Sequence, residues 1–550
     1  MNRFLALSVV TVMVGLLLSG LVLAQGWENI RINDDQTQEL QNEQQVVVNP
    51  TNPLNLVAVW RDFRLGYRQV GYGFTNDGGF TWTNPGLFVD PHYQRDSDPA
   101  LTVNAEGDFF AMLLAYTGDT GLPNGMLMYR STDGGQTWED RGFAIDGVPG
   151  VFEDKEFIAC DRTGSPFHGR IYMAWTRFYT TDILCVSSGD EGDTWTSERL
   201  VSDNSGTQFP TPAVGPDGTL YVAWTDFNDD ALKIDRSFDG GLTFGNDIMV
   251  NFVANPSAYL NGDISSPAHP AMDIDISGSN YNGRIYIAYL SIANGSSDYD
   301  IFIQSSDFQG VIWSAPIRIN DDDFNNGRDQ FHPWLTVDNN GAITVIWLDR
   351  RHDPSNLRWH CYLSQSFDGG LTWSANQQVS TVESDPNDAK KQAPDPGKGI
   401  TSVPVMDEAD TRAGLIGEYI GIACWDGHAT PVWTDTRNGH QDTYGGWMGA
   451  TAVEDDEPLA TTMLRIFPNP ALGPTTLHFA VPVDGWVSLK LFDVAGRLVR
   501  TLVDRKLRRG SHQFVWNGTD QTGGRVASGA YLVRFEASGA QETRTIILRR

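Results

Sequence analysis

An eight-residue pattern that recurs through the first 373 residues restricts the fold of this chain more than any other feature. It reads Ser/Thr-x-Asp-x-Gly-x-Thr followed by Trp or Phe, and intact copies occupy 75–82, 131–138, 188–195, 237–244 and 366–373. A degenerate copy with one additional residue is expected at 305–313. Aspartate caps backbone amides and glycine adopts positive φ, so each copy predicts a tight turn. Recurrence about every 50–60 residues indicates a repeat architecture.

Each repeat is expected to contain a first strand, a second strand that ends in an aromatic residue, and a third strand that leads into the octet. The seventh unit has no octet of its own, and the segment 30–35 is identical to 317–322, an expected outer strand. We therefore expect the N-terminal segment to supply the outer strand of the last unit, which would close the ring and remove open sheet edges. The seven expected second strands are 56–60, 109–116, 171–175, 220–224, 285–289, 343–347 and 429–433.

In these octets the chain resembles the sialidase-like Asp-box (BNR repeat) β-propellers over about residues 27–450. The resemblance implies an all-β fold, a six- or seven-bladed β-propeller, and the seven units favour seven blades. The octets themselves are structural turns, so we place none of their residues in a site.

The two ends of the chain differ from this body. Residues 1–24 contain Arg3, an apolar run and small residues before Gln25, which predicts a signal peptide. We expect the propeller at 25–450, an acidic linker at 451–462, and a small β-sandwich at 463–550. The last region resembles immunoglobulin-like C-terminal domains of the hook-capping type and sorting domains of the Por (type IX) secretion pathway. This resemblance implies a secreted or cell-surface protein whose C-terminal domain is recognised by secretion machinery.

Charge and cysteine usage exclude several classes of function. Residues 463–550 hold 13 Lys+Arg against 6 Asp+Glu, and the remaining 462 residues hold 26 against 63. Such an acidic body repels nucleic acid, so we expect no nucleic-acid partner. The resemblance to sialidase-like propellers implies a glycan or glycoprotein partner, and we expect a monomeric protein. The four cysteines lack metal-ligand spacing. Cys160 and Cys185 lie in one repeat, where both a disulfide and buried free thiols are possible.

We expect no metal cofactor, although one loop leaves calcium open. Asp273, Asp275 and Ser277 loosely resemble the start of a calcium-binding loop, but the closing glutamate is missing. The loop at 275–286 also repeats the loop at 161–172, which favours a longer ordered turn in both places.

Three second strands end in Trp-x-Asp-x-Arg, which supplies the candidate substrate-binding residues. They belong to units one, six and seven, which are neighbours in a closed ring. Converging guanidinium groups could clamp a carboxylate, as in the arginine triad of sialidases. Alternatively, each aspartate pairs with an arginine to hold its own loop, and the Phe/Tyr-Arg-Ile-Pro segment of sialidases is missing from the first unit. The candidates are Asp62, Arg64, Asp349, Arg351, Asp435 and Arg437.

The resemblance also implies a catalytic set of a tyrosine nucleophile, a glutamate that withdraws its proton and an aspartate acid/base. Tyrosine needs an adjacent carboxylate because its ordinary pKa is about 10. Starts of first strands offer Tyr419, Glu153 and Asp98 for these roles. The alternative for Tyr419 is packing in the central channel.

Together these features favour a secreted or surface sialidase-like protein that acts on glycans, with a retaining mechanism if it is catalytic. A non-catalytic surface propeller that binds glycan or protein is the alternative. A third hypothesis is cleavage of another polysaccharide by paired carboxylates, Asp98 and Asp154.

Overall fold

The computed structural model describes residues 25–117, 122–293, 295–388, 416–450, 464–467, 471, 475–481, 485–507, 510–537 and 540–549. The expected signal peptide (1–24) and linker (451–462) lie outside the described residues. The chain divides into two compact units, one of Trp27–Met448 and one that contains Gly449–Arg550. Every regular element of the described residues is a strand, which confirms the all-β expectation. This part of the chain accordingly has no helix of the length and apolarity that a membrane span requires.

The larger unit contains six four-stranded antiparallel sheets that follow one another in chain order. We number them sheets 1 to 6. From first to outer strand, sheet 1 contains β2 (Gln41–Val48), β3 (Leu56–Asp62), β4 (Gln69–Thr75) and β5 (Thr83–Leu87), and sheet 2 contains β6 (Arg95–Val103), β7 (Phe109–Tyr116), β8 (Asn124–Ser131) and β9 (Glu139–Ile145). Sheet 3 contains β10 (Glu153–Cys160), β11 (Ile171–Arg177), β12 (Asp182–Ser188) and β13 (Arg199–Leu200), and sheet 4 contains β14 (Thr207–Val214), β15 (Leu220–Asp226), β16 (Ala231–Ser237) and β17 (Ile248–Phe252). Sheet 5 contains β20 (Ala271–Ile274), β21 (Ile285–Ile292), β22 (Tyr299–Ser306) and β23 (Ile317–Arg318), and sheet 6 contains β24 (Gln330–Val337), β25 (Ile343–Asp349), β26 (His360–Ser366) and β27 (Gln377–Gln378).

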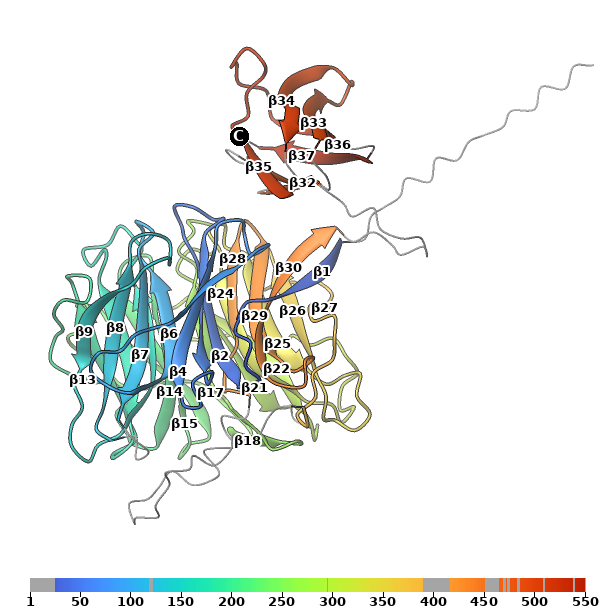
Figure 1. The fold of residues 1–550 in the computed structure, drawn as a ribbon. Helices are drawn as coiled ribbons and strands as arrows, with labels where there is room; N and C mark the ends of the chain where they lie inside the picture. The colour runs from blue at the N-terminus through green and yellow to red at the C-terminus, as the bar shows by residue number, and fades with distance from the viewer. Residues whose placement is uncertain are drawn as a thin grey trace, which may run out of the picture. The chain divides into compact units, whose positions relative to one another are not determined.

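A seventh sheet joins the two ends of this unit. Its order is β28 (Gly421–Trp425), β29 (His428–Asp435), β30 (Asp442–Ala450) and β1 (Gln25–Arg31). Figure 1 shows β1 beside β30, although the two strands lie more than 400 residues apart in the chain. A separate hairpin of β18 (Ser257–Leu260) and β19 (Ile264–Pro267) precedes sheet 5.

The two identical segments make the same contacts in sheets 7 and 5. Arg31 Nε lies 3.0 Å from Asp442 Oδ1, and Arg318 Nε lies 2.6 Å from Asp300 Oδ1. The asparagine two residues later donates to the same carboxylate in each case, Asn33 at 2.8 Å and Asn320 at 2.6 Å. The two segments therefore share a sequence because each makes the same contacts at the outer edge of its sheet.

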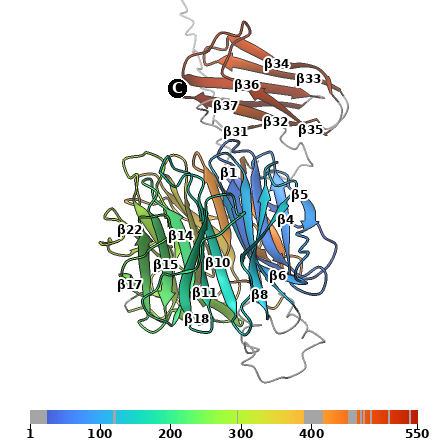
Figure 2. The same cartoon turned by 90° about the vertical axis from the view of Figure 1, so that its left-hand side faces the viewer.

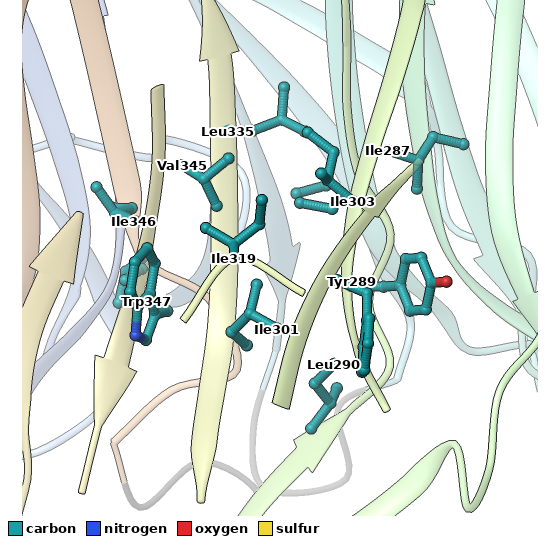
Figure 3. Packing of buried hydrophobic residues seen from close by; sticks show 14 of the residues in the cluster. Ile287, Tyr289, Leu290, Ile301, Ile303, Ile319, Leu335, Val345, Ile346 and Trp347 are labelled. Atoms are coloured by element: carbon teal, nitrogen blue, oxygen red, sulfur yellow. The ribbon is translucent and has the colours of Figure 1, made fainter. Parts of the chain in front are cut away.

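The first strands of the sheets contact one another in the order β2, β6, β10, β14, β20, β24, β28 and again β2. Figures 1 and 2 show labelled first strands such as β6 and β14 within the larger unit. Both faces of each second strand are buried, as in β25, where all seven residues are buried. Figure 3 shows the result between neighbouring sheets, where Ile301, Ile319 and Val345 pack together. Continuous apolar strands fit sheets covered on both faces.

The intact octets are closed by side-chain hydrogen bonds, as their composition predicts. In 366–373, Ser366 Oγ donates to Asp368 Oδ1 at 2.9 Å, and Asp368 accepts the Thr372 amide at 2.8 Å. The same bonds recur in the other four copies. The aspartate carboxylate thus accepts hydrogen bonds from backbone amides that have no backbone partner in a tight turn.

The degenerate octet differs from its expected alignment. Its serine is Ser306, which accepts the Gly310 amide at 3.1 Å, just as Ser366 accepts the Gly370 amide at 2.9 Å. Phe308 therefore stands where the other copies have aspartate. The copy is 306–313 with no additional residue, so the expected insertion is wrong.

The C-terminal unit packs two sheets around their own core. One sheet has the order β31 (Leu464–Phe467), β32 (Thr475–Val481), β35 (Gly510–Trp516). The other has the order β34 (Leu498–Leu507), β33 (Gly485–Asp493), β36 (Gly529–Ala537), β37 (Ala540–Leu548). Leu477, Leu489, Trp516 and Phe535 are among the fully or nearly fully buried side chains between them.

Candidate functional site

Five of the first strands begin with a β-bulge whose residue adopts positive φ without being glycine. Register shifts interrupt the pairing of β2, β6, β10, β14 and β24 at this point. Side chains rarely tolerate this backbone conformation, and such strain gathers at functional sites. The residues, with φ between 46° and 60°, are Glu43, Asp98, Lys155, Phe209 and His332.

Three of these bulge residues meet in one buried cluster. Lys155 Nζ lies 2.7 Å from Asp98 Oδ2, 2.8 Å from Glu418 Oε2 and 4.0 Å from Glu43 Oε1. Arg61 Nη1 lies 3.1 Å from Glu43 Oε1. None of the five side chains is more than 11% exposed. We call Glu43, Arg61, Asp98, Lys155 and Glu418 the central charged cluster; its members come from sheets 1, 2 and 3 and from the segment before β28.

The environment of the cluster shifts the pKa values of two of its carboxyl groups in opposite directions. Burial, only partly offset by Arg61, raises the pKa of Glu43 to about 7. Burial also pushes the pKa of Asp98 upward, but Lys155 and Arg61 outweigh it and hold that pKa below its usual range. One carboxyl can therefore exchange a proton near neutral pH while its neighbour stays ionised, which is the division of roles that acid–base catalysis uses.

Further carboxyl groups surround the cluster. Burial raises the pKa of both Asp154 and Glu156 well above the usual range. Neither oxygen of Glu156 has a hydrogen-bond partner among the described residues. Arg68, between β3 and β4, has its pKa raised by Tyr116, Asp98 and Glu43. The Arg68 side chain is hydrogen-bonded to Tyr116, the residue that raises its pKa most.

Tyr419 lies next to this cluster, but among the described residues its hydroxyl bonds to a backbone carbonyl and to no carboxylate. The side chain is 2% exposed, and its hydroxyl donates to the Pro99 carbonyl at 3.3 Å. Its ring packs against Phe157 and Trp334, with centroids 5.3 and 6.0 Å away. Burial, followed by the charges of Glu43 and Asp98, raises the pKa of the phenol. This geometry fits a tyrosine that holds the Asp98–Pro99 bulge rather than an activated nucleophile.

Glu153 belongs to a different set of hydrogen bonds from Tyr419. Trp175 Nε1 donates to Glu153 Oε2 at 2.7 Å, and Arg177 Nε donates to Oε1 at 2.8 Å. The side chain of Glu153 is fully buried. Its carboxylate is thus occupied by the end of its own second strand.

The three predicted Trp-x-Asp-x-Arg segments make this same clamp within each sheet. Asp62 accepts from Trp60 at 2.8 Å and from Arg64 at 2.7 Å. The equivalent distances are 2.8 and 2.8 Å at Asp349, and 2.9 and 2.7 Å at Asp435.

The arginines also reach outer strands instead of one another. Arg351 pairs with Asp321 at 2.7 Å, and Arg437 donates to Asn29 at 2.8 Å. Arg64 lies 3.5 Å from Asn84. The three guanidinium groups share no partner, so the structure favours loop support over a common carboxylate site.

Glu43, Arg61 and Arg68 were not among the residues expected from sequence. Glu43 lies in Gln41-Asn-Glu-Gln-Gln45, where every neighbour is polar. Aligning the first strands with one another would have identified Glu43. Glu43, Asp98 and Lys155 each stand three residues before an apolar residue, namely Val46, Leu101 and Ile158.

The possible calcium loop is closed by its own hydrogen bonds. Asp275 accepts the Ser277 amide at 2.8 Å, and Asp273 accepts the Val337 amide at 2.8 Å. Asp161 accepts the Thr163 amide at 2.8 Å in the matching loop. The searched part of the chain brings no three Asp, Glu, His or Cys side chains into metal-binding geometry. All four cysteines are free and buried.

Comparison with known proteins adds information mainly about the two ends of the chain. A family model described as the FlgD Ig-like domain matches residues 476–541, so the C-terminal unit contains an immunoglobulin-like domain. A curated sialidase of Micromonospora viridifaciens is 30% identical over 126 residues, a match that covers 19% of this chain and 19% of the sialidase. The chain thus matches less than a fifth of that relative.

Solved structures resemble the larger part of the chain at low identity. An intramolecular trans-sialidase of Ruminococcus gnavus is 12% identical, covers 60% of this chain and 94% of its own, and has a TM-score of 0.44. An α-L-arabinofuranosidase of Fusarium graminearum is 13% identical, covers 62% of this chain and 97% of its own, and has a TM-score of 0.41.

Proposed function

We propose that this chain is a secreted or surface-displayed β-propeller that acts on glycans. In this proposal each of the seven sheets is one blade and β1 completes the last blade. The octets are Asp-boxes, residues 1–24 direct export, and 463–550 form a sorting domain that secretion machinery recognises. The cyclic contacts of the first strands and the matched contacts of Arg31 and Arg318 support the closed ring.

One observation carries the functional part of the proposal. Glu43 and Asp98 are strained bulge residues of adjacent sheets, and both lie within 4.0 Å of Lys155 Nζ, yet their pKa values are displaced in opposite directions. The nearest oxygens of the two carboxyl groups cannot lie farther apart than those two distances combined. Glycosidases place their carboxyl pairs about 5–9.5 Å apart, and this upper limit falls inside that range, so the pair is compatible with the shorter spacing of retaining enzymes.

Roles follow from the two protonation states. Glu43, with a pKa of about 7, is the proton donor to the glycosidic oxygen. Asp98, held ionised by Lys155 and Arg61, is the carboxylate that attacks or stabilises the sugar in a retaining reaction. Asp98 therefore takes the role of nucleophile or stabilising carboxylate in place of the acid/base role that the family resemblance implies. Tyr419 positions the bulge of Asp98 through Pro99.

A binding module without catalysis is the second candidate. It is favoured by the mutual pairing of the cluster, in which Lys155 already contacts Asp98 and Glu418. A saturated set of ion pairs holds its geometry well but offers few groups to a reacting sugar.

Hydrolysis of a fluorogenic sialoside and a fluorogenic α-L-arabinofuranoside tests the proposal, since the matched proteins bear these names. We expect turnover of one substrate class that falls above pH 7 as Glu43 loses its proton. Glu43→Gln should lower kcat by about 100-fold or more, the usual contribution of a general acid. Tyr419→Phe should lower it much less. Glu106→Gln changes an exposed carboxyl in the turn after β6, outside the cluster, and serves as the control.

Two results would contradict this assignment. Turnover that survives Glu43→Gln and Asp98→Asn would move catalysis elsewhere. A complete absence of turnover, accompanied by binding of either glycan, would leave the non-catalytic module.

A further inference from the structure

A pocket separate from the central charged cluster opens between sheets 4 and 5. Its volume is about 450 Å³, and it lies between the outer strand β17 and the strands β21 and β22. No member of the central charged cluster lines it. Pockets of about 300–1,000 Å³ are typical of small-molecule sites. This one is large enough for one or two sugar rings.

Aromatic rings form the wall of the pocket. Phe252 is 66% exposed, and Tyr289 stacks against Phe302 with centroids 6.0 Å apart. Figure 3 shows Tyr289 pointing away from Ile301 and Ile319, which pack on the opposite side of the same sheet. An exposed aromatic face beside a pocket offers apolar stacking area at little entropic cost.

The position of the tyrosine ring is fixed by hydrogen bonds. Asn251 Nδ2 donates to Tyr289 Oη at 2.8 Å, and Tyr289 Oη donates to Gln304 Oε1 at 2.7 Å. A wall held in this way is already arranged for a ligand, which lowers the cost of binding.

Two polar groups at the pocket retain bonding capacity. The carboxylate of Asp230 receives no hydrogen bond or ion pair from the described residues, although the Asp230 carbonyl accepts the Val253 amide. Ser291 Oγ accepts the Ala254 amide at 3.1 Å, which leaves its hydroxyl proton for another acceptor. The pocket thus offers a carboxylate acceptor and a hydroxyl donor beside an aromatic surface.

The charges of the lining select the class of ligand. Asp230 is the single charged residue that lines the pocket, and no lysine, arginine or histidine does so. An anionic ligand would find no counter-charge and would face Asp230, whereas hydroxyl groups can donate charge-assisted hydrogen bonds to a carboxylate. A ligand with apolar ring faces and many hydroxyl groups fits both features.

We propose that the pocket between sheets 4 and 5 is an accessory binding site for a neutral saccharide. The choice of a sugar rests on the proposed glycan-acting function, while the site itself uses none of the catalytic candidates. The sugar stacks on Phe252, donates hydroxyl hydrogen bonds to Asp230 and accepts one from Ser291. Such a site would hold a glycan chain on the protein while another part of it reaches the central charged cluster.

Titration of the purified full-length protein tests this site with lactose, arabinotriose and 3′-sialyllactose. We expect at least one neutral saccharide to bind, and Phe252→Ala and Asp230→Asn each to weaken that binding tenfold or more. Phe308→Ala removes another exposed phenylalanine, 60% accessible, from an octet turn and should leave binding unchanged. Lactose and 3′-sialyllactose differ by one acidic sugar, so their comparison isolates the effect of ligand charge.

The results separate this proposal from the proposed function. Binding that survives both pocket variants, or binding of 3′-sialyllactose that is tighter than lactose and lost in Phe252→Ala, overturns the neutral-sugar pocket. Failure of all three saccharides to bind also overturns it. Glu43→Gln should abolish hydrolysis yet keep pocket binding. If hydrolysis is absent while pocket binding persists, the catalytic proposal fails and the pocket stands.

Discussion

At the scale of single residues, the ends of the second strands are held by one recurring clamp. A tryptophan and an arginine both donate to one buried carboxylate, which is an aspartate in sheets 1, 6 and 7. In sheet 3 the carboxylate is Glu153 from the neighbouring first strand. The clamp gives hydrogen-bond partners to a buried indole and a buried carboxylate at once. This need explains why the Trp-x-Asp-x-Arg segment recurs although its copies bind no common ligand.

The clamp makes a direct prediction about stability. Asp349→Ala leaves the Trp347 indole and the Arg351 guanidinium without their shared acceptor. Breaking a buried ion pair from one side costs about 3–5 kcal/mol, so the free energy of unfolding should fall by that order. Urea unfolding measures it, with exposed Asp323→Ala as the control. A loss as small as that of the control would show that the clamp contributes nothing.

Two buried histidines predict a loss of stability in acid. His269 and His332 are 3% and 2% exposed, and burial lowers their pKa values to about 3 and about 4. The charge of Lys155 adds to the effect at His269. Because an unfolded histidine binds its proton at a pKa of about 6.5, the unfolded state gains more protons as pH falls below that value.

The expected size follows from the same difference. Each histidine should remove about 2 kcal/mol of stability between pH 6.5 and pH 4.5, where the folded side chain is still mostly neutral. Comparing urea unfolding of the natural protein and His332→Gln at pH 7 and pH 4.5 isolates one contribution. Equal acid sensitivity of the two proteins would contradict the prediction.

At the scale of elements, the octet turn could be predicted because all its bonds are local. Serine, aspartate, glycine and threonine contact one another within five residues, so their spacing alone specifies the turn. The expected second strands were found for a similar reason, since each is a short apolar run with an aromatic end. Local chemistry of this kind leaves its full signature in the sequence.

The central charged cluster could be predicted only in part. Asp98 was expected because it lies at the start of a first strand, but Glu43 lies among polar residues with no distinguishing pattern. Its role depends on a bulge and on contacts with Lys155, more than 100 residues away. The arginines are the opposite case. Trp-x-Asp-x-Arg is conspicuous in sequence, but each arginine bonds to the aspartate of its own segment, and sequence spacing cannot distinguish such a local pair from a shared ligand site.

The degenerate octet allows a prediction about the turn itself. Phe308 and Ile312 occupy the aspartate and threonine positions, and both side chains are exposed. Phe308→Asp with Ile312→Thr should restore the capping bonds and stabilise the protein by about 1 kcal/mol, a typical net gain for capping hydrogen bonds. Thermal unfolding measures the gain.

A matched control separates capping from the removal of an exposed ring. Phe238 is 58% exposed and lies between Ser237 and Asp239, at a position that makes no capping bond. Phe238→Asp should therefore leave stability nearly unchanged. An equal gain in both proteins would mean that loss of exposed apolar surface, and not the turn, is responsible.

At the scale of the whole molecule, the larger unit depends on its N-terminal strand. Trp27 and Ile32 are 8% and 2% exposed and belong to the cores of that unit. Without this strand, β30 would become an open sheet edge, and Asp442 would lose Arg31 and Asn33. Exposed edges invite pairing with other chains, so the strand contributes to solubility as well as stability.

Deletion and return of that strand test this dependence. A chain that begins after residue 35 should unfold several degrees lower than one that begins at residue 25 and should aggregate at high concentration, because the edge of β30 is exposed. A synthetic peptide of residues 25–35 added in trans should restore both properties by pairing with β30. The same peptide with Arg31→Ala and Asn33→Ala should restore much less, since both side chains serve Asp442. If the shortened chain is as stable and soluble as the longer one, sheet 7 does not need β1. If the altered peptide rescues equally well, the bonds of Arg31 and Asn33 to Asp442 do not hold β1 in the sheet.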